Sequence, residues 1–262
     1  MAIELESEIN YLSLARKLVK PVREAGQVIM DIYQLGASAK IKDDGSPVTK
    51  ADLASEAILL PAISVAAPSI QIVSEESSEN KANQNLKNFW LIDPIDGTYD
   101  YINDRDEFTI NAGLIINNRP EVGIIYAPAK KRLFYAYHKD ECFEFTNNKE
   151  KKLDCSKLTK QGNVKAVSYS NKLKPEIENL HKKFKVTEHV KMKSSLKFCV
   201  IASGEYDLYI AEPRACEWDI AAGHAILKHA GGLITDFENK EILYGKKDFR
   251  NPSLILKRSS LL

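Results

Sequence analysis

The chain has 262 residues, enough for one large domain or two packed lobes, and no stretch approaches the roughly 18 consecutive apolar residues of a membrane span. The net charge of +1 conceals two unequal halves: residues 1–150 carry 16 Lys and Arg against 23 Asp and Glu, and residues 151–262 carry 21 against 13. An acidic half suits cations and a basic half suits phosphates or nucleic acid, although surface drift without function gives the same imbalance.

The first predicted element is a helix. Apolar residues from Leu12 to Tyr33 recur at helical spacing, and Pro21 inside this run is expected to kink the helix or split it in two. Residues 40–52 predict a short strand or turn because Asp-Gly and Ser-Pro interrupt them. A second helix is predicted over residues 51–64.

Strands and helices then alternate along the chain. Residues 146–163 are polar, lysine-rich and aperiodic, so they predict a boundary or an exposed loop. Strands are predicted within the ranges 70–77, 89–92, 108–138 and 164–170. Helices are predicted over residues 174–184 and 218–232.

The cysteines and the N-terminal residues bear on the compartment. The four cysteines lie far apart and fit neither a zinc site nor a disulfide framework: Cys142, Cys155, Cys199 and Cys216. Residues 1–18 are acidic and periodic, which differs from a secretory signal. We therefore predict reduced thiols in a cytoplasmic protein, either free or held peripherally at the inner membrane.

Carboxylates fall where predicted strands end. Glu75 and Glu76 follow one strand, Asp93 and Asp96 follow the next, and Asp219 begins a helix. A single acid in such a place is a common helix cap, and for Asp219 alone capping is the simpler interpretation. Several acids packed together would repel one another, and a hard divalent cation such as Mg²⁺ removes that repulsion.

The stretch "DPIDGT" has the features of a metal–phosphate junction. Pro94 turns the chain, so Asp93 and Asp96 can point to one side with the carbonyl of Ile95 between them as a further oxygen ligand. Gly97 permits tight backbone geometry, and Gly97-Thr98 would open a helix whose free N–H groups favour phosphate.

These motifs resemble a known family. "TKAD" (49–52), "SEES" (74–77), "DPIDGT" (93–98) and "WDIAAG" (218–223) resemble, in order, the motif set of the inositol monophosphatase superfamily of lithium-sensitive, Mg²⁺-dependent phosphatases. Within it the chain looks most like the bacterial 3'(2'),5'-bisphosphate nucleotidases, because of "SSLKFCVIASGEYDLY" (194–209) and neighbouring segments. The activity implied is removal of the 3'-phosphate of adenosine 3',5'-bisphosphate, a by-product of sulfate assimilation.

The resemblance assigns roles to individual residues. Glu75, Asp93 and the Ile95 carbonyl would hold one Mg²⁺ ion; Asp93, Asp96 and Asp219 would hold a second. Glu75 could serve a third, weaker ion with water, and it is also predicted as a catalytic residue. Asp52 and Thr98 would position and deprotonate the attacking water, in contrast to Asp52 as a plain cap. Glu76 is left open between a site role and a surface role.

The same resemblance predicts the substrate contacts. They would come from Gly97 and Thr98 on the scissile phosphate, and from Ser194, Ser195 and Lys197 on the nucleotide. The chain departs from the family pattern at Tyr99, where a lysine is usual, and at "LYIAEPR", where "LYPR" is usual. Arg214 therefore either reaches the substrate from a shifted position or is a surface charge. His224 and His229 lack helical zinc spacing and are interpreted as structural or surface histidines.

The fold implied is a layered α/β sandwich of the α+β type, with αβαβα layers. An N-terminal α+β lobe (1–150) would hold a large, mostly antiparallel sheet and most metal ligands. A smaller C-terminal α/β lobe (151–262) would carry Asp219 and the nucleotide side of the pocket. The sequence does not decide between a monomer and a homodimer.

Three alternatives remain beside this prediction. An inositol-1-monophosphatase or a fructose-1,6-bisphosphatase of the same superfamily would use the same metal site. A nucleic-acid-binding module would use the basic half, but aromatic–basic interleaving and RNA-binding signatures are absent from the sequence, so nucleic acid is not an expected partner. A catalytically silent scaffold conflicts with the complete set of site residues.

Overall fold

The computed structural model describes residues 9–36, 39–42, 45, 47–77, 86–156, 163–260 and 262. The helices of these residues are α2 (Tyr11–Gln34), α3 (Lys50–Ala66), α4 (Thr98–Ile102), α5 (Pro175–Lys183), α6 (Leu196–Ala202) and α7 (Glu217–His229), with 3₁₀ turns η1 (Glu75–Ser77) and η3 (Pro128–Lys130). Within this part of the chain, no helix combines the length and apolar character that crossing a lipid bilayer requires.

The strands form two main sheets and one hairpin. A seven-stranded sheet has the order β3 (Gln71–Ser74), β4 (Phe89–Asp96), β5 (Thr109–Ile116), β6 (Arg119–Ala127), β7 (Arg132–His138), β8 (Glu141–Thr146), β9 (Lys149–Lys152). A five-stranded sheet has the order β11 (Val186–Lys191), β10 (Val164–Ser168), β12 (Leu208–Ala211), β14 (Leu254–Lys257), β13 (Leu233–Thr235). The strands β1 (Ala39–Ile41) and β2 (Pro47–Thr49) pair with each other.

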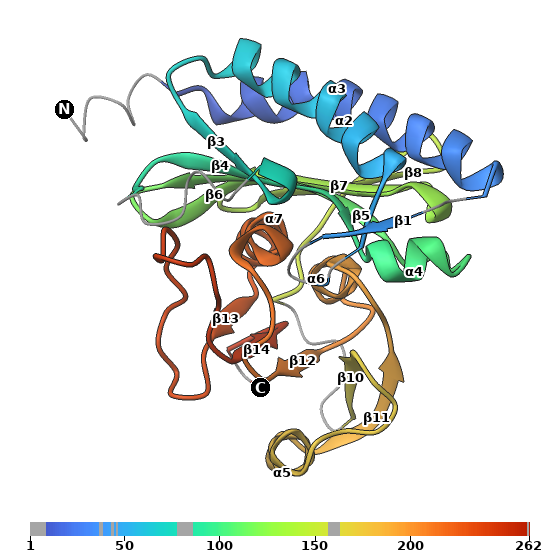
Figure 1. The fold of residues 1–262 in the computed structure, drawn as a ribbon. Coiled ribbons are helices and arrows are strands. Elements are labelled where there is room, and N and C mark those ends of the chain that lie inside the picture. Colours follow the sequence, from blue (N-terminus) through green and yellow to red (C-terminus); the bar gives the residue numbers. More distant parts are fainter. Residues whose placement is uncertain are drawn as a thin grey trace.

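Five layers result (Figure 1). Helices α2 and α3 cover one face of the large sheet, α6 and α7 lie between the two sheets, and α5 covers the far side of the small sheet. In the large sheet β3 and β4 are parallel and the remaining pairs are antiparallel. This arrangement confirms the predicted αβαβα sandwich with a large, mostly antiparallel sheet.

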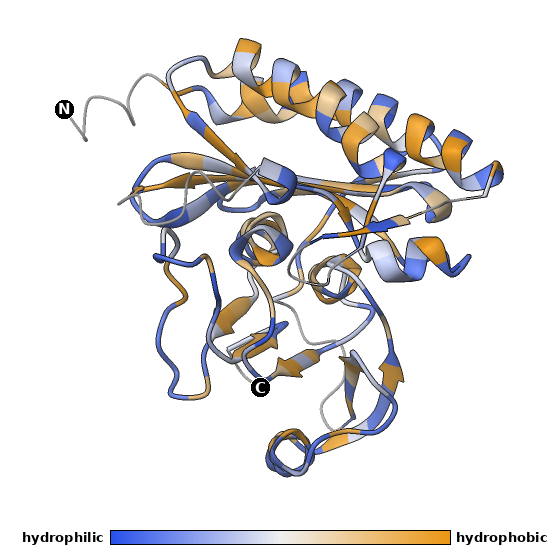
Figure 2. Ribbon diagram, in the orientation of Figure 1, coloured by the Kyte–Doolittle hydropathy of each residue, from blue (hydrophilic) through white to orange (hydrophobic). Residues whose placement is uncertain are grey.

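Burial follows these layers. One apolar cluster fills the space between α2, α3 and the large sheet. A second joins the other face of that sheet to α6, α7 and strands of the small sheet. In Figure 2, α2 and α3 carry hydrophobic and hydrophilic residues side by side, as expected for helices with one face on a sheet and one in water.

The structure decides one predicted alternative and corrects one predicted detail. Helix α2 continues through Pro21, so the helix is not split, and its apolar face is buried on both sides of Pro21. The polar stretch 146–163 contains β9, an edge strand of the large sheet, although residues 157–162 lie outside the described part. The predicted division between residues 150 and 151 therefore falls within a strand, and two separate lobes stay a prediction.

Candidate metal centre and adjoining pocket

Parallel pairing brings the first two acids together. Ser74 in β3 is the register partner of Ile92 in β4, and Glu75 and Asp93 are the next residues of their chains. Asp219 approaches from α7 on the other side. Carboxylate oxygens of Glu75, Asp93 and Asp219 all lie within 4.8 Å of one another. Three of the acids predicted to bind metal therefore converge.

A β-bulge explains the spacing of Asp93 and Asp96. Asp93 pairs with Asn111 of β5 and Asp96 pairs with Thr109, so two residues of β4 oppose one residue of β5. Pro94 lies in this bulge, where its missing N–H removes no ladder hydrogen bond. The N–H of Ile95 instead donates to Asp93 Oδ1 at 3.0 Å. The predicted turn between the two acids is thus a bulge.

The electrostatics of the cluster favour a cation. Burial raises the pKa of Asp93 well above its usual range, and the charges of Glu75, Asp96 and Asp219 raise it further. Burial also raises the pKa of Asp219 well above its usual range, and the charges of Asp96 and Glu75 raise it further. Since buried like charges are unfavourable when unpaired and hard oxygen donors suit Mg²⁺, the residues present fit such an ion.

Asp219 is both a helix cap and a member of the cluster. Its Oδ2 accepts the N–H of Cys216 at 2.7 Å, which satisfies one of the free donors at the start of α7. The capping and metal-binding interpretations are therefore compatible, because a carboxylate has two oxygens.

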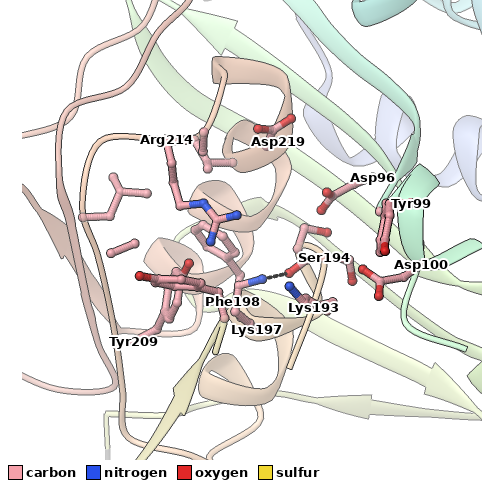
Figure 3. A pocket seen from close by; sticks show the side chains of 17 residues that line it. Asp96, Tyr99, Asp100, Lys193, Ser194, Lys197, Phe198, Tyr209, Arg214 and Asp219 are labelled. Atoms are coloured by element: carbon pink, nitrogen blue, oxygen red, sulfur yellow. Dashed lines mark hydrogen bonds between the residues drawn. The ribbon is translucent and has the colours of Figure 1, made fainter. Parts of the chain in front are cut away.

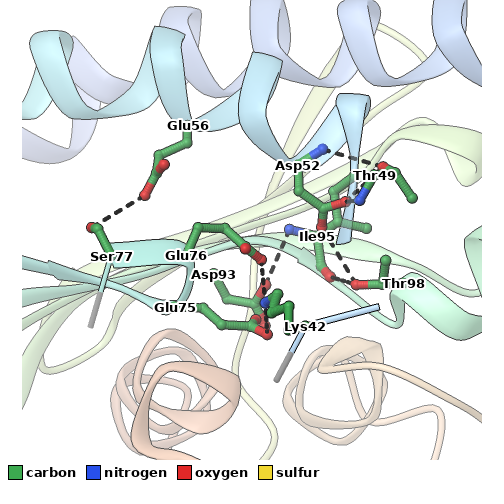
Figure 4. Close-up of polar contacts among 10 residues, drawn as sticks. All are labelled: Lys42, Thr49, Asp52, Glu56, Glu75, Glu76, Ser77, Asp93, Ile95 and Thr98. Carbon is green, nitrogen blue, oxygen red and sulfur yellow. Dashed lines mark hydrogen bonds and ion pairs between the residues drawn. The ribbon is translucent and has the colours of Figure 1, made fainter. Parts of the chain in front are cut away.

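Asp52 and Thr98 lie together as predicted (Figure 4). Asp52 Oδ2 accepts two hydrogen bonds from Thr49, at 2.7 Å from its backbone N–H and at 2.6 Å from its hydroxyl. Oδ1 remains directed at Thr98 Oγ1, 3.4 Å away, and the same hydroxyl lies 3.0 Å from the carbonyl oxygen of Ile95. Burial raises the pKa of Asp52, against the hydrogen bonds from Thr49.

Lys42 is a residue of the site that sequence reasoning missed. Its ammonium lies 3.2 Å from Glu75 Oε1 and 2.7 Å from Glu76 Oε1 (Figure 4). Burial lowers the pKa of Lys42, but the two carboxylates outweigh burial and the net direction is upward. Burial raises the pKa of Glu76 to about 7 despite this partner. Glu76 therefore contacts the site through Lys42.

A cavity of about 380 Å³ adjoins the acidic cluster (Figure 3). Asp96 and Asp219 line it on one side, and Lys193, Lys197 and Arg214 line it on the other. Arg214 lines the pocket although its side chain is exposed, and its guanidinium carbon lies 4.3 Å from the centre of the Tyr169 ring. Tyr99, 62% exposed, lies at the rim.

The loop before α6 holds the other predicted substrate contacts. Lys197 is 8% exposed, and its ammonium donates to the Ser194 carbonyl. Burial lowers the pKa of Lys197 to about 8, against the pull of Asp96. Ser194 and Ser195 both line the cavity, and the Ser195 hydroxyl is bonded to Thr109 and Asn111.

Gly97 has the tight backbone geometry that was predicted, and the two histidines lie in the protein interior. Gly97 has φ +95°, and an added Cβ would lie 2.9 Å from the backbone oxygen of Glu107. His224 Nδ1 lies 2.9 Å from the Tyr244 hydroxyl, and His229 Nε2 lies 2.9 Å from the Glu121 carbonyl. Both histidines are buried away from the acidic cluster, which confirms a structural role.

Residues 12–260 match the profile of the inositol monophosphatase family. The chain belongs to this family. The 3'(2'),5'-bisphosphate nucleotidase CysQ of Buchnera aphidicola is 34% identical over 87% of this chain and 86% of the relative. CysQ of Salmonella typhimurium is 33% identical over 88% of this chain and 94% of the relative.

Solved structures agree with the family assignment. The crystal structure of CysQ from Bacteroides thetaiotaomicron has a TM-score of 0.75 and 28% identity, covering 93% of this chain and 96% of that one. Inositol monophosphatase from Anabaena, at 24% identity, matches in fold with a TM-score of 0.76. The predicted family and fold are confirmed, while the homodimer and the cytoplasmic location stay predictions.

Proposed function

We propose that this family member is a Mg²⁺-dependent phosphomonoesterase that removes the 3'-phosphate of adenosine 3',5'-bisphosphate. The observation that supports this substrate is the cationic wall of the pocket. Within the described part of the chain, Lys193, Lys197 and Arg214 make no ion pair with a carboxylate, yet they face the acidic cluster across one cavity. Such a wall suits a second phosphate on the substrate.

The metal side accounts for phosphate hydrolysis. Glu75, Asp93, Asp96, Asp219 and the Ile95 carbonyl would hold two Mg²⁺ ions, with a third served by Glu75. When bound, these ions supply Lewis-acid chemistry and neutralise phosphoryl charge. The backbone N–H groups of Gly97 and Thr98 would bind the phosphoryl oxygens.

Asp52 and Thr98 would orient the attacking water and accept its proton. The Thr98 hydroxyl has one hydrogen and lies 3.0 Å from the Ile95 carbonyl oxygen and 3.4 Å from Asp52 Oδ1. With a cation on that carbonyl, the hydrogen would turn to Asp52, and the hydroxyl oxygen could accept a hydrogen bond from water. As the water attacks, its proton passes to Thr98, and the Thr98 proton passes to Asp52. The raised pKa of Asp52 makes its carboxylate a better proton acceptor near neutral pH.

A substrate panel tests the proposal. With Mg²⁺ present, kcat/KM for adenosine 3',5'-bisphosphate should exceed that for inositol 1-phosphate by at least roughly tenfold, or about 1.4 kcal/mol in transition-state binding. Lys197→Ala should remove much of this difference, and Arg214→Ala should resemble it. Fructose 1,6-bisphosphate completes the panel. If inositol 1-phosphate or fructose 1,6-bisphosphate is the better substrate, the nucleotidase proposal fails and the phosphatase family assignment stands.

A further inference from the structure

Three buried polar side chains join the two sides of the site. Thr109 and Asn111 lie on β5 and are 0% exposed, and Ser195 precedes α6 and is 2% exposed. Ser195 Oγ lies 2.8 Å from Thr109 Oγ1 and 2.6 Å from Asn111 Oδ1. A hydroxyl buried to this extent is unfavourable unless its hydrogen bonds are satisfied, so these two partners fix the position of the Ser195 side chain.

The direction of these hydrogen bonds can be assigned. An amide oxygen carries no hydrogen, so Ser195 donates to Asn111 Oδ1. A hydroxyl has one hydrogen, so Thr109 donates to Ser195. With Oδ1 on Ser195, the Asn111 Nδ2 is the end nearer the Asp96 carboxylate, which can act as an acceptor alone.

The Asn111 amide nitrogen is aimed at the metal side. It is buried and makes no fully formed hydrogen bond among the described residues. Asn111 and Thr109 are the register partners of Asp93 and Asp96 on the neighbouring strand β4. The two residues that hold Ser195 therefore lie directly beside two of the predicted metal-binding acids.

The same loop carries the cationic wall. Lys193 and Lys197 flank Ser195, and Ser194 between them has φ +53°, a left-handed conformation that needs support from its surroundings. The backbone N–H of Lys193 donates to Glu107 Oε2 at 3.1 Å, which fixes the loop at its start. Ser195 fixes it in the middle.

We propose that Thr109 and Asn111 are positioning residues that hold the Ser195 loop and the Asp96 carboxylate in one arrangement. The metal-binding side and the anion-binding side of the pocket then form together. Ser195 acts in this scheme through its position, with its hydroxyl committed inside the protein. The substrate part of the inference rests on the proposed function, and the metal part does not.

The test uses a matched pair at Thr109. Thr109→Val keeps the shape and loses the hydroxyl, whereas Thr109→Ser keeps the hydroxyl. Mg²⁺ affinity is measured by calorimetry on the metal-free protein without substrate. We expect roughly tenfold weaker Mg²⁺ binding in Thr109→Val and Asn111→Ala, the effect of a lost hydrogen bond near a charge, and near-normal binding in Thr109→Ser. The double variant should lose less than the product of the two changes, since both act through Ser195.

Kinetics at saturating Mg²⁺ give the second measurement. In Thr109→Val the KM for adenosine 3',5'-bisphosphate should rise roughly tenfold, while kcat and the KM for inositol 1-phosphate change little. A lower melting temperature with unchanged Mg²⁺ affinity and an unchanged ratio of the two KM values would overturn the proposal. If wild-type protein does not prefer the bisphosphate, the proposed substrate fails separately, and the Mg²⁺ affinities of the Thr109 pair still decide the positioning role.

Discussion

Asp93 is a residue that is unfavourable for the folded chain on its own and that we propose as a metal ligand. It is 1% exposed and lies beside Glu75 and Asp219. A lone buried carboxylate is costly, and like charges increase that cost. The sequence predicted that Asp93 would lie among other acids, because its position at a strand end and the motif around it indicated a ligand, and the three carboxylates do converge. Its role as a metal ligand stays a prediction.

Asp93→Asn should separate the two effects. The amide keeps an oxygen for the Ile95 N–H but loses the charge, so the metal-free protein should melt at a higher temperature. With Mg²⁺, kcat should fall by several orders of magnitude, and Mg²⁺ should no longer raise the melting temperature. EDTA should abolish wild-type activity and Mg²⁺ should restore it. Asp31→Asn on the surface of α2 is the control, and near-normal hydrolysis by Asp93→Asn would contradict the metal assignment.

Lys197 should make binding of the bisphosphate substrate weaker at alkaline pH. Its pKa is lowered to about 8 by burial, so the ammonium loses its charge as the pH rises past that value. The KM for adenosine 3',5'-bisphosphate should therefore increase above pH 8, whereas the KM for inositol 1-phosphate should not follow the same curve. Lys197→Arg keeps its charge throughout and should remove the dependence. If the KM of the wild-type protein and that of Lys197→Arg depend on pH in the same way, Lys197 is not the titrating group.

At the scale of elements, long buried strands and helices could be predicted from the sequence, and exposed edge strands could not. Strand β9 reads "KEKK" and is exposed on both faces, so it carries no apolar alternation. Lysines on an edge strand oppose sheet-to-sheet association, which is a reason for that composition. Lys42 was missed for a related reason: it follows strand β1, which pairs with β2, and it meets Glu75, 33 residues further along the chain, so no local pattern marks the contact.

Lys42 should compete with metal ions. Its ammonium lies between Glu75 and Glu76 where a cation would also be favourable. In Lys42→Met the two carboxylates lose this partner, so Mg²⁺ should bind several-fold more tightly to the metal-free protein and that protein should be less stable. Calorimetric titration measures the affinity. Lys40→Met, on the same hairpin, is the control, and weaker Mg²⁺ binding in Lys42→Met would show that Lys42 supports the ion.

For the whole molecule, α7 holds the layers together. It packs against β4, β5, β6 and β7 of the large sheet and against β13 of the small one. Two glycines of the large sheet permit this approach. A Cβ on Gly113 would lie 2.8 Å from Ala221 Cβ, and one on Gly123 would overlap the backbone oxygen of Ala222. The sequence predicted a helix over residues 218–232, but not its central place, because periodicity does not tell which neighbours a helix packs against.

Gly123→Ala should therefore damage both stability and the metal site. The overlap is with backbone, so α7 must shift, at a cost of about 1–3 kcal/mol or more in the free energy of unfolding. Because α7 carries Asp219, Mg²⁺ affinity should fall as well. Gly36→Ala is the control: it has φ +83° and no atom within 4 Å of an added Cβ, so it should cost about 1–2 kcal/mol without changing Mg²⁺ affinity.

The order in which α7 emerges during synthesis has a consequence for the acidic cluster. Asp219 follows Asp96 by more than 120 residues, a delay of roughly 6 to 25 seconds at about 5–20 residues per second. During that interval Glu75 and Asp93 exist without their third carboxylate, while Lys42 has already been made. The complete ligand set arises when the last layer docks. Bound metal should consequently slow unfolding far more than it accelerates folding.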